Sequence, residues 1–305
     1  MPRRALLVYN PAARGAPRLD AVVAAVAALE DWEVDLESTA GPGHATELAR
    51  DAAAREFSAV LACGGDGTVH EVVNGLAGSG TALAVVRGGT ANVWAKEARV
   101  PKKPGPAVAL LDAGVERAVD LGRATWPGGE RYFLLMAGVG LDAEIVRSLS
   151  PRLKRWLGAT AYVVAGLRRA VTYRTLDVDL AIDGETVRSG LYWLLAGNTR
   201  SYGGLLDITL DARLDDGALD VAVLQRGGLH RLAWLLPWVL LRRHRRRRHV
   251  LYRTARSLAI EAPGLPVQLD GEAAGETPVR FDAVPRALRV IVPRGLDAPL
   301  FGAGA

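Results

Sequence analysis

A glycine-rich loop that holds one carboxylate is the first place in the sequence where chemistry is expected. Gly64, Gly65, Asp66, Gly67 and Thr68 lie between a short apolar run and a stretch with helical spacing. The free N–H groups and the dipole at the start of a helix attract phosphate, and glycines let the backbone approach the anion closely. Asp66 would repel a bare phosphate, so its carboxylate indicates a Mg²⁺ ion that neutralises both charges. The alternative is a tight turn at Asp66 with Thr68 as a helix cap.

A second glycine pair lies in segment 88–92 (GGTAN), which also follows an apolar run and precedes a helical segment over 93–98. Two such loops at the ends of consecutive strands converge at the carboxyl edge of a parallel sheet, where open α/β folds bind their ligands. A plain turn closed by an Asn or Thr cap is the alternative. The sequence has no G-x-x-x-x-G-K-[ST], no complete G-x-G-x-x-G and no protein-kinase H-R-D or D-F-G triplet, which excludes those phosphate-binding motifs.

The elements that carry these loops alternate between strand and helix over the first 120 residues. Apolar runs predict strands over residues 5–9, 32–38, 58–63 and 82–86. Apolar residues at helical spacing predict helices over residues 18–30, 44–56 and 69–76. This alternation predicts a parallel sheet with helical crossovers.

Beyond about residue 120 the pattern favours antiparallel β structure. Further apolar runs lie at residues 132–139, 176–182, 187–196, 218–224, 256–261, 265–269 and 287–292. Asp-Gly pairs separate several of these runs, as is typical of β-hairpins, at residues 183–184, 216–217 and 270–271. Two helices are expected within this half, over residues 151–170 and 229–243.

The composition favours two folded domains in a reducing compartment. A chain of 305 residues is long enough for two cores, and with 50% hydrophobic and 23% charged residues it is unlike a disordered protein. Cys63 is the single cysteine and cannot form an intrachain disulfide, so we expect a cytoplasmic protein. We expect neither a signal peptide nor a transmembrane helix, because the apolar runs are too short for either.

The basic character of the chain is concentrated in one place. The formal net charge is +5, and the segment 242–249 (RRHRRRRH) alone holds six arginines. Trp234, Trp238 and several leucines come directly before it. Indoles prefer the headgroup level of a membrane and arginines an anionic surface, so we expect peripheral docking to an anionic membrane through Arg242–Arg248. The alternative is that the apolar residues before the arginine run pack into the core of the second domain and the arginines are merely solvated. No nucleic-acid partner is expected, since no aromatics alternate with the arginines as stacking platforms.

In their order along the chain, the motifs resemble those of the diacylglycerol kinase catalytic domain family, which includes bacterial soluble lipid kinases and sphingosine and ceramide kinases. The GGDGT segment alone is shared with NAD kinases, whereas the ordered set is specific to this family. The matching segments are 10–11 (NP), 64–72 (GGDGTVHEV), 89–92 (GTAN), 137–143 (AGVGLDA), 197–198 (GN), 202–204 (YGG), 214–220 (LDDGALD) and 269–272 (LDGE).

The resemblance implies an α/β plus all-β protein. A nucleotide-binding α/β domain like those of NAD kinases and phosphofructokinases would span residues 1–120, and a β-sandwich domain for the lipid substrate residues 121–285. The segment 286–305 would return to the first domain, and the cleft between the domains would hold ATP and the lipid head. The implied enzyme is an ATP- and Mg²⁺-dependent lipid kinase, cytoplasmic and peripherally associated with the inner face of the membrane.

Matching positions also imply roles for individual residues. Nucleotide contacts are implied at Asn10, Thr39, Gly64, Gly65, Asp66, Gly67, Thr68, Val69, His70, Glu71, Gly89, Thr90 and Asn92. Asp66 would organise Mg²⁺-ATP and Glu272 would act as the catalytic base, because a lipid hydroxyl needs a proton acceptor. A metal site is implied at Asp216 with the backbone carbonyls of Arg213 and Ala218.

The sequence leaves several alternatives open. Asp142 is expected to reach a substrate head group or, equally, to cap the helix that follows it. The triplet Asp270-Gly271-Glu272 has an identical copy at 183–185, and either copy read alone is an ordinary hairpin turn. Val93 stands where many relatives carry an aspartate, which weakens any assignment of the lipid.

The acceptor (diacylglycerol or a related lipid), the choice between Mg²⁺ and Ca²⁺ at Asp216, and homodimer formation are undecided. A soluble-metabolite kinase of the NAD-kinase type and a non-catalytic lipid-binding regulator are the alternative functions.

Overall fold

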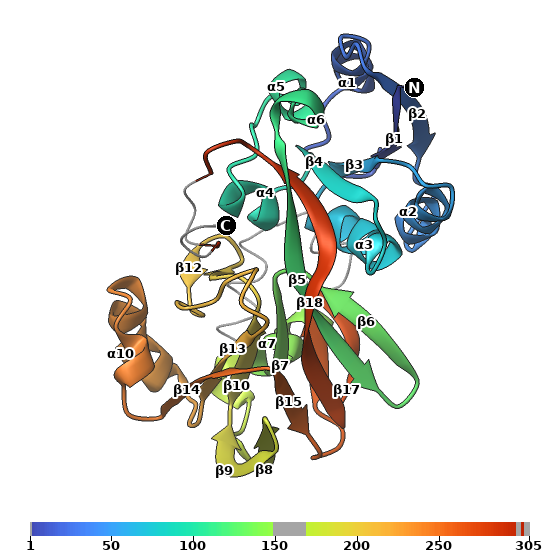
Figure 1. Cartoon of the computed structure of the whole chain (residues 1–305). Coiled ribbons are helices and arrows are strands. Elements are labelled where there is room, and N and C mark those ends of the chain that lie inside the picture. Colours follow the sequence, from blue (N-terminus) through green and yellow to red (C-terminus); the bar gives the residue numbers. More distant parts are fainter. Residues whose placement is uncertain (1, 149–168, 297–299, 302–305) are drawn as a thin grey trace. The chain divides into compact units, whose positions relative to one another are not determined.

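The computed structural model describes residues 2–148, 169–296 and 300–301. Nearly all of the helix predicted over 151–170 lies outside the described residues. The chain divides into two compact units, one made of Met1–Leu121 with Arg286–Ala305 and the other of Gly122–Pro285. Figure 1 labels the elements of both units.

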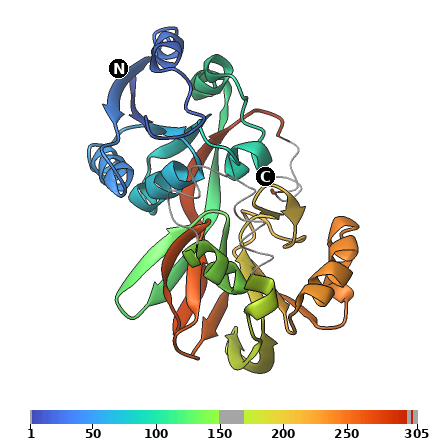
Figure 2. The same cartoon turned by 180° about the vertical axis from the view of Figure 1, so that it is seen from behind.

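The first unit is a parallel sheet with helical connections. Its elements are β1 (Arg3–Tyr9), α1 (Leu19–Val26), β2 (Trp32–Ser38), α2 (His44–Ala54), β3 (Ala59–Gly64), α3 (Asp66–Leu76), β4 (Ala82–Arg87), α4 (Val93–Glu97), α5 (Pro104–Val108) and α6 (Leu110–Ala113). The strand order is β2-β1-β3-β4, with all neighbours parallel. Helices α2 and α3 pack side by side (Figures 1 and 2). Strand β3 is buried along its whole length, which explains its uninterrupted apolar run.

The second unit is a β-sandwich. Its elements are β6 (Gly129–Phe133), β7 (Met136–Gly140), α7 (Leu141–Ser148), β8 (Leu176–Ile182), β9 (Glu185–Leu191), β10 (Trp193–Gly197), β11 (Ser201–Tyr202), β12 (Leu206–Asp207), β13 (Leu219–Leu224), α10 (Leu229–Leu240), the 3₁₀ helix η1 (His244–Arg246), β14 (Val250–Ala255), β15 (Ser257–Ile260), β16 (Pro266–Leu269) and β17 (Glu272–Glu276). One antiparallel sheet has the order β14-β13-β10-β7-β16-β17. Its buried side chains share one core with those of β8 and β15, so two sheet faces enclose the core. The predicted α/β and β-sandwich classes are confirmed.

Two long strands belong to both units. Strand β5 (Val115–Trp126) leads out of the first unit, and β18 (Val279–Val292) leads back into it. The start of β18 pairs antiparallel with β15, whereas its end pairs parallel with β4, with Arg289 opposite Ala82. The last strand of the second unit therefore becomes the next strand of the first unit's sheet.

The differences from the sequence-based expectation include two helix ends and one predicted turn. Helix α1 ends at Val26 rather than at residue 30, and the acidic Glu30 and Asp31 would be unfavourable at the negative end of a longer helix. Helix α10 ends at Leu240, shortly before Arg242 takes a left-handed φ of 53°. The predicted hairpin turn at residues 216–217 is wrong, because this pair lies in the loop before β13, well after the short strands β11 and β12. Of the helices in the described residues, none is long and apolar enough to cross a membrane.

Two Asp-Gly turns of the second unit have the same backbone geometry. Asp183 and Gly184 join β8 to β9 with φ values of 47° and 85°, and Asp270 and Gly271 join β16 to β17 with 50° and 84°. Consecutive left-handed residues are what a two-residue hairpin loop of type I′ requires. The two copies of the Asp-Gly-Glu triplet are therefore the same turn.

The two aspartates differ in how many backbone donors they satisfy. The Asp270 carboxylate accepts hydrogen bonds from the N–H groups of Leu134 (2.9 Å), Leu135 (2.8 Å) and Met136 (3.0 Å). The exposed Asp183 carboxylate accepts two, from Arg256 at 2.9 Å and Ser257 at 2.8 Å. Asp270 thus fixes the start of β7 to the turn that precedes Glu272.

We expect Asp270→Ala to lower the free energy of unfolding by about 3 kcal/mol and Asp183→Ala by about 1 kcal/mol, because the first variant leaves the N–H groups of three buried residues without this acceptor. Both variants place alanine at a position with a left-handed backbone, so the destabilisation from this strain is the same in the two proteins. Urea unfolding of both proteins gives the difference. Equal losses would contradict the anchoring role of Asp270.

Candidate functional site

The two glycine loops of the first unit are in direct backbone contact. Strands β3 and β4 are parallel neighbours, and the N–H of Gly88 donates to the carbonyl of Gly64 at 2.7 Å. A β-carbon on Gly89 would lie only 2.6 Å from the α-carbon of Gly65. Glycine is therefore required at this approach, and the expected convergence of the two loops occurs.

The segment after β1 joins the same loops. Asn10 Nδ2 donates to Thr68 Oγ1 at 2.8 Å, and the N–H of Gly15 donates to the carbonyl of Gly88 at 2.9 Å. Thr68 is buried inside α3, whose N-cap is Gly65, so Thr68 is not the cap of this helix. Its hydroxyl instead links α3 to the end of β1.

The Asp66 carboxylate bridges the two loops. Asp66 is the first residue of α3, where the helix dipole favours a negative charge, and its Oδ1 accepts from the N–H of Val93 at 2.6 Å. Asn92 closes the second loop, because its Oδ1 accepts from the N–H of Gly89 at 2.8 Å and its Nδ2 donates to the Gly89 carbonyl at 2.5 Å. Val93, the departure from the family pattern, buries its side chain and uses its backbone to hold Asp66.

The remaining predicted nucleotide residues are placed differently. Thr39 follows β2 at the same edge of the sheet, where its N–H donates to the carbonyl of Tyr9 at 2.9 Å, and Thr90 is exposed in the second loop. Val69 and His70 are buried within α3. Glu71 Oε2 accepts from the N–H of Ala45 at 3.1 Å, which ties it to the start of α2. The structure thus gathers Asn10, 64–68 and 89–92 and gives 69–71 packing roles.

In the second unit a buried network supports the turn that carries Glu272. Gln268 Nε2 donates to Asp142 Oδ2 at 2.7 Å, and Gln268 Oε1 accepts from the N–H of Gly271 at 2.7 Å. Tyr202 donates its hydroxyl to the other oxygen of Asp142. Asp142 is 2% exposed, in the first turn of α7, and burial raises its pKa to about 6, with the two hydrogen bonds acting in the opposite direction. Tyr202 belongs to the YGG segment that resembles the family pattern, and Gln268 directly precedes the LDGE segment, but nothing in the sequence pairs either residue with Asp142.

Glu272 and its copy Glu185 differ in their surroundings. Glu272 is half-buried at the start of β17, opposite Leu269, whereas Glu185 is exposed at the start of β9. The first turn is held by Gln268, by the three donors on Asp270 and by the N–H of Asp270, which donates to the carbonyl of Met136 at 2.9 Å. The second turn is held by the two donors on Asp183 and by the N–H of Asp183, which donates to the carbonyl of Ser257 at 3.0 Å. The environment, and not the turn type, distinguishes the two glutamates.

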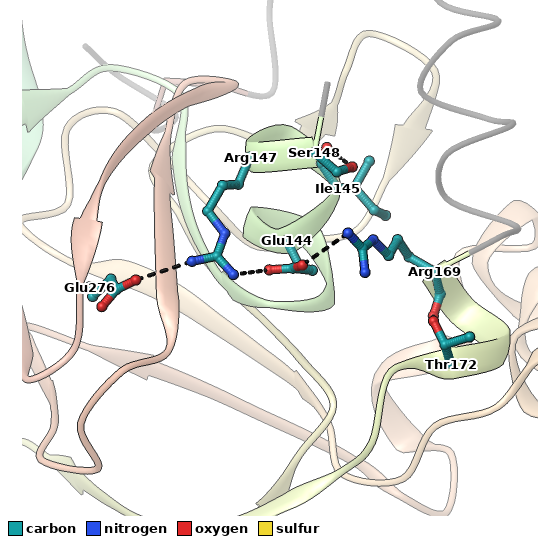
Figure 3. A network of polar contacts seen from close by, with 7 residues as sticks. All are labelled: Glu144, Ile145, Arg147, Ser148, Arg169, Thr172 and Glu276. Carbon is teal, nitrogen blue, oxygen red and sulfur yellow. Dashed lines mark hydrogen bonds and ion pairs between the residues drawn. The ribbon is translucent and has the colours of Figure 1, made fainter. Parts of the chain in front are cut away.

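Ion pairs connect α7 to β17 (Figure 3). Arg147 lies between Glu276 of β17 (3.1 Å) and Glu144 of α7 (2.7 Å), and Glu144 also pairs with Arg169 at 3.4 Å. Beside β17 is an open hollow of about 500 Å³ whose lining includes Arg147 and Glu276 but not Glu272. The network therefore fixes the helix that carries Asp142 against the strand that carries Glu272.

The predicted metal residues form a turn before β13. Asp216 is exposed, and its Oδ1 accepts from the N–H of Ala218 at 3.1 Å. Burial raises the pKa of nearby Asp220, and the negative charges of Asp211 and Asp216 raise it further. A carboxylate with backbone carbonyls is a donor set that suits Mg²⁺ or Ca²⁺. Within the described ranges, no group of three or more His, Cys, Asp or Glu residues is arranged to hold a metal ion.

The raised pKa of Asp142 predicts a pH-dependent stability. The folded state binds this proton more tightly than the unfolded chain, whose aspartate has a pKa of about 3.9. The stability that the protonated carboxyl contributes is therefore complete below about pH 4 and is lost as the pH rises through about 6.

We expect Asp142→Asn to remove this loss, so that the variant gains stability relative to the unchanged protein between about pH 4 and about pH 6 and keeps that gain above this range. Urea unfolding at several pH values measures the difference. Asp177→Asn, at an exposed position of β8, is the control and should leave the pH profile unchanged. If Asp142→Asn leaves the pH dependence of the free energy of unfolding unchanged, ionisation of Asp142 costs the folded state no stability and the prediction is wrong.

Comparison with known proteins relates both units to one group of enzymes. Residues 4–124 match the diacylglycerol kinase catalytic domain, and residues 136–292 match the YegS C-terminal NAD kinase beta sandwich-like domain. A diacylglycerol kinase of Bacillus subtilis is 29% identical over 96% of this chain and 97% of its own length. A probable lipid kinase YegS-like protein of Pseudomonas putida is 34% identical over 90% of this chain and 91% of its own.

Two further relatives agree with these. A diacylglycerol kinase of Mycobacterium tuberculosis is 33% identical over 93% of this chain and 94% of its own. The crystal structure of a diacylglycerol kinase from Bacillus anthracis superposes with a TM-score of 0.76 at 25% identity, covering 96% of this chain and 98% of that one. The likeness spans nearly the full length in both sequence and fold.

Proposed function

Since this chain belongs to the family of diacylglycerol kinases and YegS-like lipid kinases, we propose that it transfers the γ-phosphate of ATP to a hydroxyl group of a lipid. The observation that carries this proposal is the contact between the two glycine loops, where bare backbone lies at the carboxyl edge of the sheet. The names of the relatives support diacylglycerol or a closely related lipid as the acceptor.

The first unit supplies the nucleotide site in this proposal. Gly65 to Thr68 begin the eleven-residue helix α3, whose free N–H groups and dipole attract the phosphates of ATP. Gly89 and Asn92 form the other wall, which Asp66 holds in place through Val93. Thr39, at the end of β2, is available to the rest of the nucleotide.

Magnesium would be held mainly through the nucleotide. When bound, Mg²⁺ neutralises the charge that builds up on the phosphates during transfer. It keeps several waters and needs only one or two protein carboxylates, which suits Asp66 in a loop where the described residues offer no larger acidic cluster. Asp216, with the carbonyls of Arg213 and Ala218, would hold a second cation that stabilises the turn before β13.

The second unit supplies the base. The Glu272 carboxylate would accept the proton of the lipid hydroxyl as that oxygen bonds to the γ-phosphorus and the bond to the ADP oxygen breaks. Asp270 and Gln268 hold the turn that precedes Glu272. Asp142 is buried, and its two carboxylate oxygens accept hydrogen bonds from Gln268 and Tyr202. We therefore assign it the role of positioning this turn rather than contact with the lipid.

We expect Gly89→Ala to weaken ATP binding by at least about tenfold, because its β-carbon would push against Gly65 and separate the two loops. Isothermal titration with a non-hydrolysable ATP analogue measures the affinity. Gly80→Ala is the matched control, since a β-carbon there meets nothing within 4 Å. Unchanged affinity in Gly89→Ala would place the nucleotide elsewhere.

We expect Glu272→Gln to lower kcat by a factor of about 10² to 10⁴ while leaving the affinity for ATP intact, because it removes the proton acceptor and keeps the shape. Glu185→Gln, the same change after the identical turn, should leave kcat unchanged. Transfer of label from γ-labelled ATP to lipids in mixed micelles gives both numbers. Equal activities of the two variants would exclude Glu272 as the base.

The same assay tests the function itself, with diacylglycerol, monoacylglycerol, phosphatidylinositol, a sphingoid base and NAD offered in parallel. Label in an organic-phase product, absent with Asp66→Ala, supports the proposal and names the acceptor. Label in NAD alone would overturn it in favour of a soluble-metabolite kinase. Label in no product would leave a non-catalytic lipid-binding protein.

A further inference from the structure

We propose that α10 and the arginine run that follows it form a docking face for an anionic lipid bilayer. The docking face consists of the exposed residues Leu229, Ala233, Trp234, Leu236, Pro237, Leu240, Leu241, Arg243, Arg246 and Arg248. The inference builds on the proposed function, because a lipid acceptor resides in a membrane. It adds the surface through which the chain would reach that membrane.

Helix α10 turns apolar side chains to solvent. Exposed fractions are 52% for Trp234, 46% for Leu236, 64% for Leu240 and 62% for Leu241. His230 is the polar exception on this outer face. A surface helix of a globular protein normally carries charged or polar residues there, and an exposed apolar patch marks an interaction site.

The opposite face of the helix anchors it to its own unit. Leu235 and Val239 are buried, and Leu232 is half-buried on the same stripe, at the i, i+3, i+7 spacing of a single helix face. The helix contacts β12 and η1 (Figures 1 and 2). The apolar residues are thus divided: one stripe is buried against its own unit and the other remains exposed. The core-packing alternative therefore accounts for only one side of α10.

The arginine run is folded back against the same helix. His244 is buried with its Nε2 2.8 Å from the carbonyl of Ile208, and Arg247 stacks on the ring of Trp238 at 3.4 Å from its centroid. Arg242 pairs with Asp207 at 2.5 Å, and Arg245 pairs with Asp211. These contacts hold the run in a fixed place next to α10.

Three arginines of the run stay available for a partner. Arg243, Arg246 and Arg248 are exposed, and within the described part of the chain none of them forms an ion pair. Of the six arginines, two pair with acids of the same unit, and the other four form no ion pair with any residue that the structure describes. The docking face combines an excess of positive charge with exposed indole and leucine side chains.

This combination suits the surface of an anionic bilayer. Apolar side chains enter the boundary between headgroups and acyl chains, tryptophan prefers that depth, and arginine binds the acidic headgroups. A second copy of the chain fits less well, because a two-fold pairing sets the same patch against itself and would bring two arginine runs together. Charge complementarity thus favours the membrane over a dimer.

The test is co-sedimentation of the full chain with vesicles, either of phosphatidylcholine alone or with about a third of phosphatidylglycerol. Leu236→Ser/Leu240→Ser should weaken binding to the anionic vesicles by about tenfold. Arg243→Ser/Arg246→Ser should weaken it by about 30-fold and reduce its sensitivity to salt. Binding of the unchanged chain to neutral vesicles should be much weaker.

Matched controls separate the docking face from exposure in general. Val23→Ser/Leu36→Ser changes two exposed apolar residues of the first unit, and Arg50→Ser/Arg256→Ser changes two exposed arginines away from the run. Both should bind like the unchanged protein. Equal losses in the controls, or no preference for anionic vesicles, would overturn the proposal. So would a dimer in sedimentation velocity that Leu236→Ser/Leu240→Ser dissolves.

Activity on a short-chain diacylglycerol dispersed without vesicles distinguishes this proposal from the proposed function. The docking-face variants should keep full turnover there and lose turnover only on long-chain diacylglycerol in anionic vesicles. Vesicle binding without turnover on any lipid would refute the kinase and leave the docking face standing. Turnover on vesicles that the variants do not change would refute the docking face alone.

Discussion

Gly65 and Gly89 approach so closely that a β-carbon on Gly89 would lie only 2.6 Å from the α-carbon of Gly65, and the arrangement of the two glycine loops in the first unit depends on that approach. Because β3 and β4 end side by side, the two loops meet as bare backbone. Two side chains add hydrogen bonds between these segments. The Asn10 amide donates to the hydroxyl of Thr68, and the Asp66 carboxylate accepts from the N–H of Val93. A surface made of peptide groups can follow the outline of a phosphate chain, since no side chain stands between them.

Carboxylates that bind backbone N–H groups recur as the means of holding loops in this protein. Asp66 does so between the two glycine loops, and Asp270 and Asp183 do so behind the two Asp-Gly turns. Charged acceptors make stronger hydrogen bonds than neutral ones, so a short side chain can fix a segment distant in sequence. The turn before Glu272 has a second support, because Gln268 donates a hydrogen bond to Asp142 and accepts one from the N–H of Gly271.

Local patterns predicted β1 to β4, the glycine loops and their convergence, because strand ends and helix starts are encoded within a few residues. They did not predict β5, β14 or β17. The strand over 32–38 has the predicted bounds. Long-range partners were beyond such patterns: nothing in the spacing joins Asp142 to Gln268, or Asp270 to the start of β7. The apolar sequence of α10 likewise predicts a helix but not which face the sandwich leaves exposed. Solvent exposure depends on what the rest of the chain covers.

Strand β18 has a consequence for how the chain is made. Its last residues pair with β4, with Arg289 opposite Ala82, so the first unit's sheet is completed by residues translated after the whole second unit. Until they leave the ribosome, β4 lacks this neighbour and offers an open edge to other strands. Local contacts between helices and strands of the first unit can form early, whereas its sheet is completed only after the sandwich has been synthesised. The order of translation thus makes the first unit the last to be finished.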